Sequence, residues 1–570
     1  MDHVLRFFRL LAVLTPICGH TQTLDWAVPF IGADESRTSD IAVDASGNSY
    51  VVGIFEGTLD VDPGPDEQLL TAAGPMDIYA VKLDPQGQLA WAYQCGGASN
   101  NSEFARGIAV DATGNVYING AFTGTSDFDP GPAVVELTSA GNPGILDGFL
   151  VKLDADGELI WAKRFGGPNA DRCNGIALDL DGNIYCSGFV NSTAEFSFNS
   201  GTITLPATST TGFVLKMDPT GSTGWVRPIT GGNGLTMTVD AQNNVYVAGF
   251  FLNTIDLDPG EGVQEVTSAG GSDMFVCKLN DQGALVWGRA MGGTDEDIVS
   301  SIAVDQAGNL FATGYFKGTA DFDPGPEVVN RTVGFYQDAF LFKFDEPGDL
   351  EWVHVYGAAE GPGVPVDYLD AGYGVACDGA GNVYACGLFT HTVDFDGGPG
   401  VQEISVLGIM DLYLLKLSSA GELMTALALG GISGDLAQAL YVNQTGDQVH
   451  VAGAFSAEMD FAPGPDTYLL STPNTFTGYV MQLEMPVTTD IGADAPPSTT
   501  ASIRPNPGTD RFSIATAPTD HEIQVFDATG RLVIAQRTTG MNTEVNTNAL
   551  RPGLYCVKLD DRASMRWVKE

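Results

Sequence analysis

Pairs of aspartates separated by one residue recur along this 570-residue chain, and their carboxylates are the side chains best placed to do chemistry. Five pairs stand in variants of Asp-x-Asp-Pro-Gly-Pro: Asp60 and Asp62, Asp127 and Asp129, Asp256 and Asp258, Asp321 and Asp323, and Asp394 and Asp396. Carboxylates at this spacing beside a glycine can supply oxygen ligands to Ca²⁺. Because Ca²⁺ takes roughly six to eight oxygens, and no third acid recurs at regular spacing, we expect these aspartates to bond turn amides instead. No metal site is predicted, and calcium is the one alternative cofactor.

The aspartate pairs belong to a unit that repeats seven times. Each unit opens with a hairpin such as IAVDASGNSYVVG from Ile41, in which alternating apolar runs flank a turn of Asp, Gly and Asn. A third apolar run and a fourth run centred on tryptophan follow. Four antiparallel strands repeated around an axis predict an all-β fold, a seven-bladed β-propeller. The Asp-x-Asp segments join the second and third strands, so we expect them to form long loops on one rim, where binding residues are common.

The two ends of the repeat region complement each other. The seventh unit stops at Glu484 without its tryptophan strand, and Trp26 in LDWAVPFIG occupies the equivalent position. We therefore predict that the N-terminal strand completes the last blade and removes two open sheet edges. The units resemble the SBBP-type β-propeller repeats of secreted bacterial proteins. This resemblance covers residues 24–484 and implies the fold but no particular function.

The segments outside the repeats predict an exported protein. Residues 1–22 are typical of a signal peptide, with Arg6 and Arg9 before a short apolar run, and we expect cleavage between Cys18 and Gln22. No apolar run reaches the roughly 20 residues of a membrane-spanning helix. We divide the chain into a signal peptide (1–22), a propeller (23–484), a Pro/Thr-rich linker (485–500) and a C-terminal domain (501–570).

The C-terminal domain carries the most specific motifs of the chain. Its alternating strands predict a small Ig-like β-sandwich. In order and spacing, three segments resemble the type A C-terminal sorting domain of type IX secretion substrates, through Pro505, Asn506, Pro507, Asp527, Gly530, Arg531, Gly553 and Tyr555. The resemblance implies that residues 501–570 engage the type IX machinery as a partner. It also implies export through the periplasm and across the outer membrane, then removal of the domain with surface attachment or release.

Charge is distributed unevenly. The whole chain has a net charge of −45, and residues 23–484 alone hold 60 acidic and 15 basic side chains. This excess excludes nucleic acid as a partner, because phosphate contacts need clustered Lys and Arg. Six lysines occupy one position of the third strand, and six aspartates end the first strand: Lys82, Lys152, Lys216, Lys278, Lys343 and Lys416, with Asp44, Asp111, Asp179, Asp240, Asp305 and Asp378. The seventh unit has Gln482 and Asn443 instead. We hypothesise a partly buried Asp–Lys pair in six blades and a neutral Asn–Gln contact in the seventh.

The remaining reactive residues predict packing rather than chemistry. An odd number of cysteines, seven after the signal peptide, is not a disulfide framework, although Cys377 and Cys386 flank one turn and could cross-link. None of the propeller histidines, His354, His391 and His450, lies in a catalytic motif, and His450 takes a tyrosine position.

We therefore predict no catalytic residue and a non-enzymatic binding or adhesion module, secreted or at the cell surface, with an extracellular glycan or protein as ligand. The alternatives are a polysaccharide-active enzyme using carboxylates in the central funnel and a structural envelope component. The enzyme alternative predicts a cluster of polar residues that breaks the sevenfold repeat. The third unit and residues 361–373 are the visible irregularities.

Overall fold

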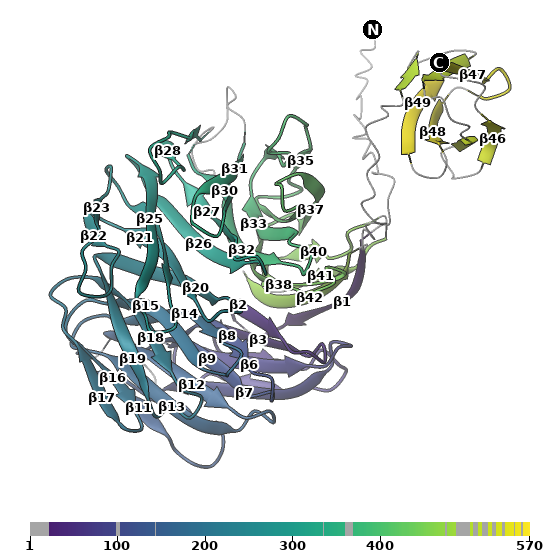
Figure 1. Ribbon diagram of the computed structural model, residues 1–570. Coiled ribbons are helices and arrows are strands. Elements are labelled where there is room, and N and C mark those ends of the chain that lie inside the picture. The colour runs from purple at the N-terminus through teal and green to yellow at the C-terminus, as the bar shows by residue number, and fades with distance from the viewer. Residues whose placement is uncertain are drawn as a thin grey trace, which may run out of the picture. The chain divides into compact units, whose positions relative to one another are not determined.

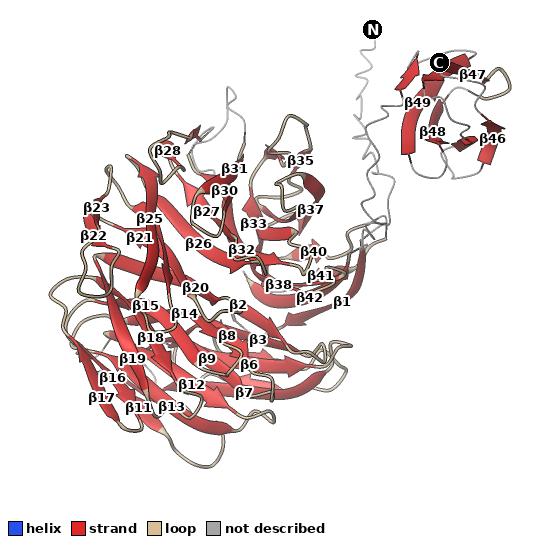
Figure 2. Ribbon diagram, in the orientation of Figure 1, coloured by secondary structure: helices blue, strands red, loops and turns tan. Residues whose placement is uncertain are grey.

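The structure, a computed structural model, contains β-strands as its only regular element among the residues that it describes (Figure 2). These are residues 22–485, except 33, 98–102, 143, 334–335, 359–368, 465 and 473–475, and residues 502–504, 511–515, 522–526, 532–537, 542–551, 553–559 and 563–569. The chain forms two compact units, Met1–Val487 and Thr488–Glu570. Nearly all of the predicted signal peptide and of the predicted linker lies outside the described residues.

Seven antiparallel sheets follow one another around a central axis, which confirms the seven-bladed propeller (Figure 1). The innermost strands are β2 (Ser36–Val43), β8 (Glu103–Val110), β14 (Arg172–Leu178), β20 (Gly232–Val239), β26 (Asp297–Val304), β32 (Ala371–Cys377) and β38 (Asp435–Val442). The second strands are β3 (Ser49–Phe55), β9 (Val116–Thr123), β15 (Ile184–Val190), β21 (Val245–Phe251), β27 (Leu310–Phe316), β33 (Val383–Phe389) and β39 (Gln448–Phe455). The third strands are β6 (Asp77–Leu83), β12 (Leu146–Leu153), β18 (Thr211–Met217), β24 (Asp273–Leu279), β30 (Asp338–Phe344), β36 (Asp411–Leu417) and β42 (Thr477–Glu484).

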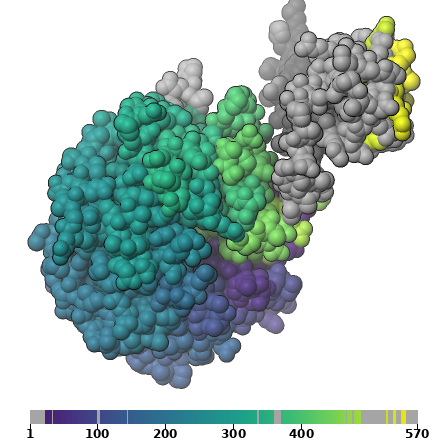
Figure 3. Space-filling model, viewed as in Figure 1, coloured from purple at the N-terminus to yellow at the C-terminus, as the bar shows by residue number. Residues whose placement is uncertain are grey.

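The N-terminal strand closes the ring as predicted. Six blades end in an outer strand that follows in sequence: β7 (Leu89–Gly97), β13 (Leu159–Gly166), β19 (Gly224–Thr230), β25 (Leu285–Gly293), β31 (Leu350–Tyr356) and β37 (Leu423–Gly431). In the seventh blade this place belongs to β1 (Thr23–Phe30), which pairs antiparallel with β42 and sets Trp26 opposite Gln482. Figure 3 shows the two chain ends of the propeller, purple and green, meeting in the ring.

The Asp-x-Asp segments differ from the expected open loops, because each forms a short β-hairpin. The hairpins are β4 (Thr58–Asp60) with β5 (Leu69–Thr71), β10 (Thr125–Asp127) with β11 (Glu136–Thr138), β16 (Ala194–Phe198) with β17 (Gly201–Leu205), β22 (Thr254–Asp256) with β23 (Glu265–Thr267), β28 (Thr319–Asp321) with β29 (Asn330–Thr332), β34 (Thr392–Asp394) with β35 (Glu403–Ser405), and β40 (Glu458–Asp460) with β41 (Leu469–Ser471). Most of them pair with the outer edge of the preceding blade, as Ser126 does with Gly97 and Asp321 with Gly292. Each such hairpin therefore covers a sheet edge that would otherwise expose unpaired backbone groups.

Seven apolar clusters fill the seven interfaces between neighbouring blades. The cluster between the first two blades, for example, joins Tyr50 and Tyr93 to Ile108 and Phe149. The last cluster joins Val28 and Val51 to Val480, across the closure of the ring. The core is thus divided among the interfaces, and each blade depends on both neighbours.

The C-terminal unit contains two antiparallel sheets. One holds β43 (Ser502–Arg504), β44 (Arg511–Ala515) and β47 (Asn542–Asn546), and the other holds β45 (Glu522–Phe526), β46 (Leu532–Arg537), β48 (Gly553–Leu559) and β49 (Ala563–Lys569). This content agrees with the all-β expectation, and the Ig-like packing of one sheet on the other stays a prediction.

Candidate functional site: the central channel

Every innermost strand of the propeller carries a β-bulge at the same position. In the first blade the pairing of β2 with β3 shifts between Thr38 and Asp40, and in the second the pairing of β8 with β9 shifts between Ala105 and Gly107. The bulges leave one residue of each strand without a cross-strand partner: Ser39, Arg106, Asn174, Leu235, Ser300, Tyr373 and Gln438. We name these seven residues the bulge ring. Bulges re-aim side chains, and they are common beside functional sites.

Repeated glycines on the second strands make room for the bulges. Gly53 pairs with Thr38, and Gly120 pairs with Ala105, in each case the residue before the bulge. A Cβ atom on Gly53 would lie 2.1 Å from the carbonyl oxygen of Arg37, and one on Gly120 would lie 1.9 Å from that of Phe104. The last glycine of each sequence repeat therefore permits the close backbone approach that the bulge requires.

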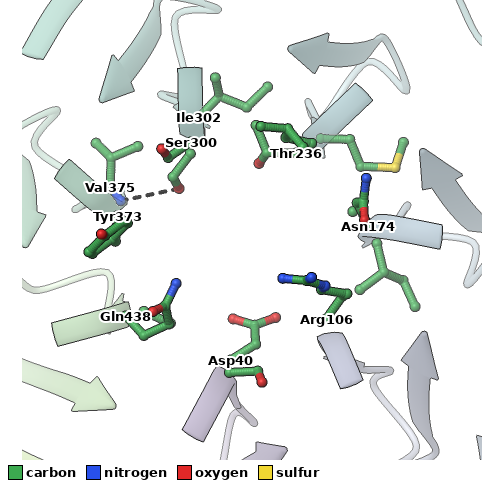
Figure 4. Close-up of a pocket in the computed structure, with 18 of the residues that line it drawn as sticks. Asp40, Arg106, Asn174, Thr236, Ser300, Ile302, Tyr373, Val375 and Gln438 are labelled. Carbon is green, nitrogen blue, oxygen red and sulfur yellow. Dashed lines mark hydrogen bonds between the residues drawn. The ribbon is translucent and has the colours of Figure 1, made fainter. Parts of the chain in front are cut away.

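The bulge ring lines a cavity of about 690 Å³ at the centre of the propeller. Figure 4 shows Arg106, Asn174, Ser300, Tyr373 and Gln438 around it, each on a different innermost strand. A volume of this size suits a small-molecule ligand, and polar side chains that converge on it can fix a ligand's orientation. The described lining combines amide, hydroxyl, guanidinium and phenol groups, and no two neighbouring blades in it present the same bulge residue.

Asp40 is the one carboxylate among the described lining residues, and it lies between Gln438 and Arg106 in Figure 4. Its carboxylate accepts hydrogen bonds from the backbone N–H of Ile41 at 2.8 Å and from that of Ile108, in the next blade, at 2.9 Å. Burial raises the pKa of Asp40 to about 7, although these two hydrogen bonds oppose the shift. Ser301 also links two blades, since its hydroxyl accepts a hydrogen bond from the backbone N–H of Val375 at 3.3 Å.

The predicted aspartate pairs serve their own hairpins. In the first blade, Asp60 accepts the N–H groups of Asp62 and Gln68 at 3.1 and 3.0 Å, and Asp62 accepts that of Gly64 at 2.7 Å. The same three bonds recur at Asp127 and Asp129, Asp256 and Asp258, Asp321 and Asp323, and Asp394 and Asp396. Within the part of the chain that the structure describes, no three His, Cys, Asp or Glu side chains gather as a metal site would require. The bonds agree with the expected role in turns, and calcium binding itself stays a matter for experiment.

The Asp–Lys hypothesis is wrong for most blades. Ion pairs join Lys216 to Asp179 at 3.8 Å and Lys416 to Asp378 at 4.0 Å. The other four lysines have different partners. Lys152, for example, donates a hydrogen bond to the carbonyl oxygen of Pro219 at 2.8 Å. All six ammonium groups instead lie 4.9–5.6 Å from the centre of an aromatic ring on the second strand, a cation–π contact.

The aspartate at the end of the first strand caps the adjacent turn instead. Asp44 accepts the backbone N–H groups of Ser46 and Asn48, the side-chain amide of Asn48 and the hydroxyl of Tyr50. Burial tends to raise its pKa, but these hydrogen bonds lower the pKa below the usual value. In the seventh blade, Gln482 bonds His450 and Asp25 rather than Asn443.

The remaining predictions concern histidine and cysteine. His450 is buried beside Trp26 and Tyr441, as expected of a packing residue, and burial lowers its pKa to about 4. Cys377 and Cys386 do not form a disulfide, because Cys377 pairs with Val383 and Cys386 pairs with Gly374 along the hairpin. The six propeller cysteines, Cys95, Cys173, Cys186, Cys277, Cys377 and Cys386, are free thiols, and all but Cys377 are buried.

The bulge ring escaped the sequence analysis, although a signal was present. Its residues stand two positions before the apolar residue that opens each hairpin motif, at Ile41, Ile108, Ile176, Met237, Ile302, Val375 and Leu440. Aligning the seven units with one another would have exposed this column as variable beside repeated neighbours. Of the irregularities that were noticed, the one at residues 361–373 ends at Tyr373, which belongs to the ring, and residues 361–368 lie outside the described residues.

Known proteins resemble both units of the chain. Residues 502–570 match the secretion system C-terminal sorting domain, and residues 160–188 match the SBBP β-propeller repeat. An uncharacterized WD repeat-containing protein of Acanthamoeba polyphaga mimivirus is 22% identical over 512 residues, which are 76% of this chain and 36% of that protein. The chain thus spans little more than a third of this relative's length.

Three solved structures are similar at low identity. The Dos1 propeller gives a TM-score of 0.38 at 7% identity, covering 80% of this chain and 95% of its own. A quinohemoprotein alcohol dehydrogenase of Pseudomonas putida gives 0.35 at 11% identity, covering 86% and 79%. PorZ, a surface component of the type-IX secretion system of Porphyromonas gingivalis, gives 0.14 at 12% identity, covering 95% and 100%.

The sorting-domain match falls on the segment that carries the predicted sorting motifs. Gly553 and Tyr555 lie on β48, opposite Lys569 and Trp567 of β49. The other motif positions, Pro505, Asn506, Pro507, Asp527, Gly530 and Arg531, lie outside the described residues. No helix among the described residues is long and apolar enough to cross a membrane. The chain is a β-propeller that contains an SBBP repeat and ends in a type IX secretion C-terminal sorting domain, and it is a secreted or cell-surface protein.

Proposed function

We propose that the exported propeller is a non-enzymatic binding module that holds a small glycan, or the end of a larger one, in its central channel. The observation that carries the proposal is the bulge ring. The chain repeats its turns, glycines and tryptophans from blade to blade, but it varies the one side chain per blade that the bulge directs into the cavity. Packing alone would favour the same residue in every blade, whereas recognition of an asymmetric ligand needs different groups.

Hydrolysis is the second candidate, because the pKa of Asp40, raised to about 7, suits a general acid. Most glycoside hydrolases, however, use two carboxylates roughly 5–9.5 Å apart. Asp40 is the single carboxylate in the described lining, and backbone N–H groups of two adjacent blades already occupy its oxygens. These contacts support a linking role for Asp40 and favour binding over cleavage.

A glycan array probed with the purified protein tests the proposal. We expect retention of a restricted set of glycans, and a loss of signal in Gln438→Leu, because a lost neutral hydrogen bond weakens binding by roughly two- to tenfold. The matched control is Gln68→Leu, since Gln68 is exposed on an outer hairpin and outside the channel. Equal loss in both variants, or no bound glycan at all, would contradict channel binding. A reducing-end assay on the retained glycans separates the alternatives, because new reducing ends that disappear in Asp40→Asn would establish hydrolysis.

A further inference from the structure

Two arginines in the channel stand apart from every other arginine of the propeller. Of the seven arginines in residues 23–484, five have partners: Arg37 pairs with Glu35, Arg164 pairs with Asp147, and Arg227, Arg289 and Arg331 donate to backbone carbonyl groups. Arg106 and Arg172 form no hydrogen bond, ion pair or cation–π contact with any residue that the structure describes. Both line the central cavity, on the adjacent strands β8 and β14.

The two guanidinium groups also act on each other. The surrounding protein lowers the pKa of Arg106 first through burial, and then through the like charge of Arg172. Sixty acidic side chains were available in residues 23–484 to neutralise two cations, yet none of those described does so here. Arg106 is exposed to the channel and Arg172 is half-buried, so a ligand can reach both cations, and their proximity without a neutralising acid points to a function outside the fold.

The neighbouring side chains narrow the class of ligand. A guanidinium group offers a planar fork of N–H donors that matches the oxygens of a carboxylate or a phosphate. The cavity that Arg106 and Arg172 line also presents neutral groups, including Asn174, Thr236 and Ser300, that exchange hydrogen bonds with hydroxyl groups. Figure 4 shows these three residues and Arg106 around the cavity. The cavity of about 690 Å³ has room for a ligand of one or two sugar rings.

We propose that Arg106 and Arg172 bind the anionic group of a small, hydroxylated ligand, such as a sugar acid or a sugar phosphate. The inference rests on the proposed function, since it names the ligand chemistry of the same channel. The strongly negative propeller repels anions in general, so binding at this site requires the local pair of cations. Specific recognition of one anion is therefore expected against a background of weak non-specific binding.

Titration calorimetry on the purified protein with glucuronate, glucose 6-phosphate and glucose tests the inference. At least one of the two anions should bind at least tenfold more tightly than glucose, and the better one identifies carboxylate or phosphate as the group recognised. Arg106→Gln and Arg172→Gln should each weaken that binding by about tenfold or more, because hydrogen bonds to charged groups are the stronger ones. The control Arg331→Gln removes the same charge from an outer hairpin and should leave the affinity unchanged.

Thermal unfolding of the unliganded variants separates a binding role from a structural one. Removing one of two repelling cations should leave the midpoint of Arg106→Gln unchanged or raise it, whereas loss of a structural arginine lowers it. The inference is overturned if neither anion binds better than glucose, or if Arg106→Gln lowers both the midpoint and the affinity. If the array nevertheless shows glycan binding that depends on Gln438, channel binding survives and only the anionic ligand is excluded.

Discussion

At the scale of single residues, the contact between a tryptophan and a turn glycine is the most regular device of the propeller. The Trp91 indole N–H donates to the carbonyl oxygen of Ala155, in the turn between the third and fourth strands of the next blade. Gly157 in that turn has φ +85°, and a Cβ atom there would lie 2.8 Å from the Trp91 ring. Trp26 meets Gly87 in the same way, and Trp287 meets Gly348. Each of the first six blades is thus held against the indole of its predecessor, whereas the sixth blade has no tryptophan to offer the seventh.

The variant Gly157→Ala should destabilise the protein by roughly 1–3 kcal/mol, because alanine is strained at positive φ and its methyl group would overlap the indole ring. Chemical denaturation followed by tryptophan fluorescence measures the change. Gly464→Ala is the matched control, since an added Cβ there meets no atom within 4 Å. Equal stability of the two variants would show that the contact between the Trp91 indole and Gly157 does not stabilise the propeller.

Residue roles could be predicted where the partner lies in the same repeat. The packing role of His450 and the repeated tryptophans followed from the alignment of the units. The lysine partners could not be found in this way, because Lys152 reaches the carbonyl oxygen of Pro219, 67 residues ahead in the next blade. A pattern within one unit cannot show which of two neighbouring blades supplies a contact.

At the scale of elements, buried carboxylates mark five of the seven junctions between blades. At each of these junctions, one buried acid lies at or just before the start of an innermost strand. A second buried acid lies at or near the start of the third strand in the preceding blade. The pairs are Glu103 with Asp77, Asp171 with Asp147, Asp297 with Asp273, Asp370 with Asp338, and Asp435 with Asp411. The Asp297 carboxylate accepts the N–H of Gly293 at 2.6 Å. Burial and then the neighbouring carboxylate Asp273 raise the pKa of Asp297 to about 7. The other two junctions carry neutral residues, Thr211 with Gly232 and Thr477 with Ser36.

These acids predict that the propeller is more stable in mild acid than at neutral pH. A carboxyl group whose pKa rises from 3.8 to about 7 on folding binds its proton more tightly in the folded state. Its contribution is fully present below about pH 4 and is lost as the pH rises through about 7, on the order of 1 kcal/mol or more for each group. The thermal midpoint should therefore be higher at pH 5 than at pH 8.

Asp297→Asn isolates this effect, because the amide stays neutral at every pH. The thermal midpoint of the variant minus that of the unmodified protein should therefore be larger at pH 8, where Asp297 is ionised, than at pH 5, where it is protonated. The exposed control Asp66→Asn removes the same charge without removing a buried acid. If both variants changed the pH profile alike, the general repulsion of the acidic surface would explain the profile, and the junction acids would not.

At the scale of the whole molecule, the ring, the covering hairpins and the central channel differ in how far the sequence predicts them. The seven-bladed ring and its closure by β1 could be predicted because each blade repeats one pattern and the missing tryptophan strand stands at the other end of the chain. The hairpins that cover the neighbouring blade could not, since three-residue strands such as β10 show no alternation long enough to read. The channel escaped for a third reason: a bulge depends on backbone geometry, and only the glycine opposite it appears in the sequence.

The Asp-x-Asp hairpins and the central channel differ in their suitability for binding a ligand. The Asp-rich segments are regular and bonded within themselves, whereas the channel is irregular and carries unpaired polar groups. Export places this channel outside the inner membrane, where an extracellular ligand can reach it. The central claim is therefore that recognition occurs at the bulge ring and not on the Asp-x-Asp hairpins.

A crystal structure of the purified protein with the tightest ligand from the array and calorimetry tests that claim most directly. The account predicts ligand density inside the central cavity, with an anionic group between Arg106 and Arg172 and hydroxyl groups against Asn174 and Gln438. Ligand bound at the hairpins around Asp127 or Asp321, with the central cavity empty, would contradict it.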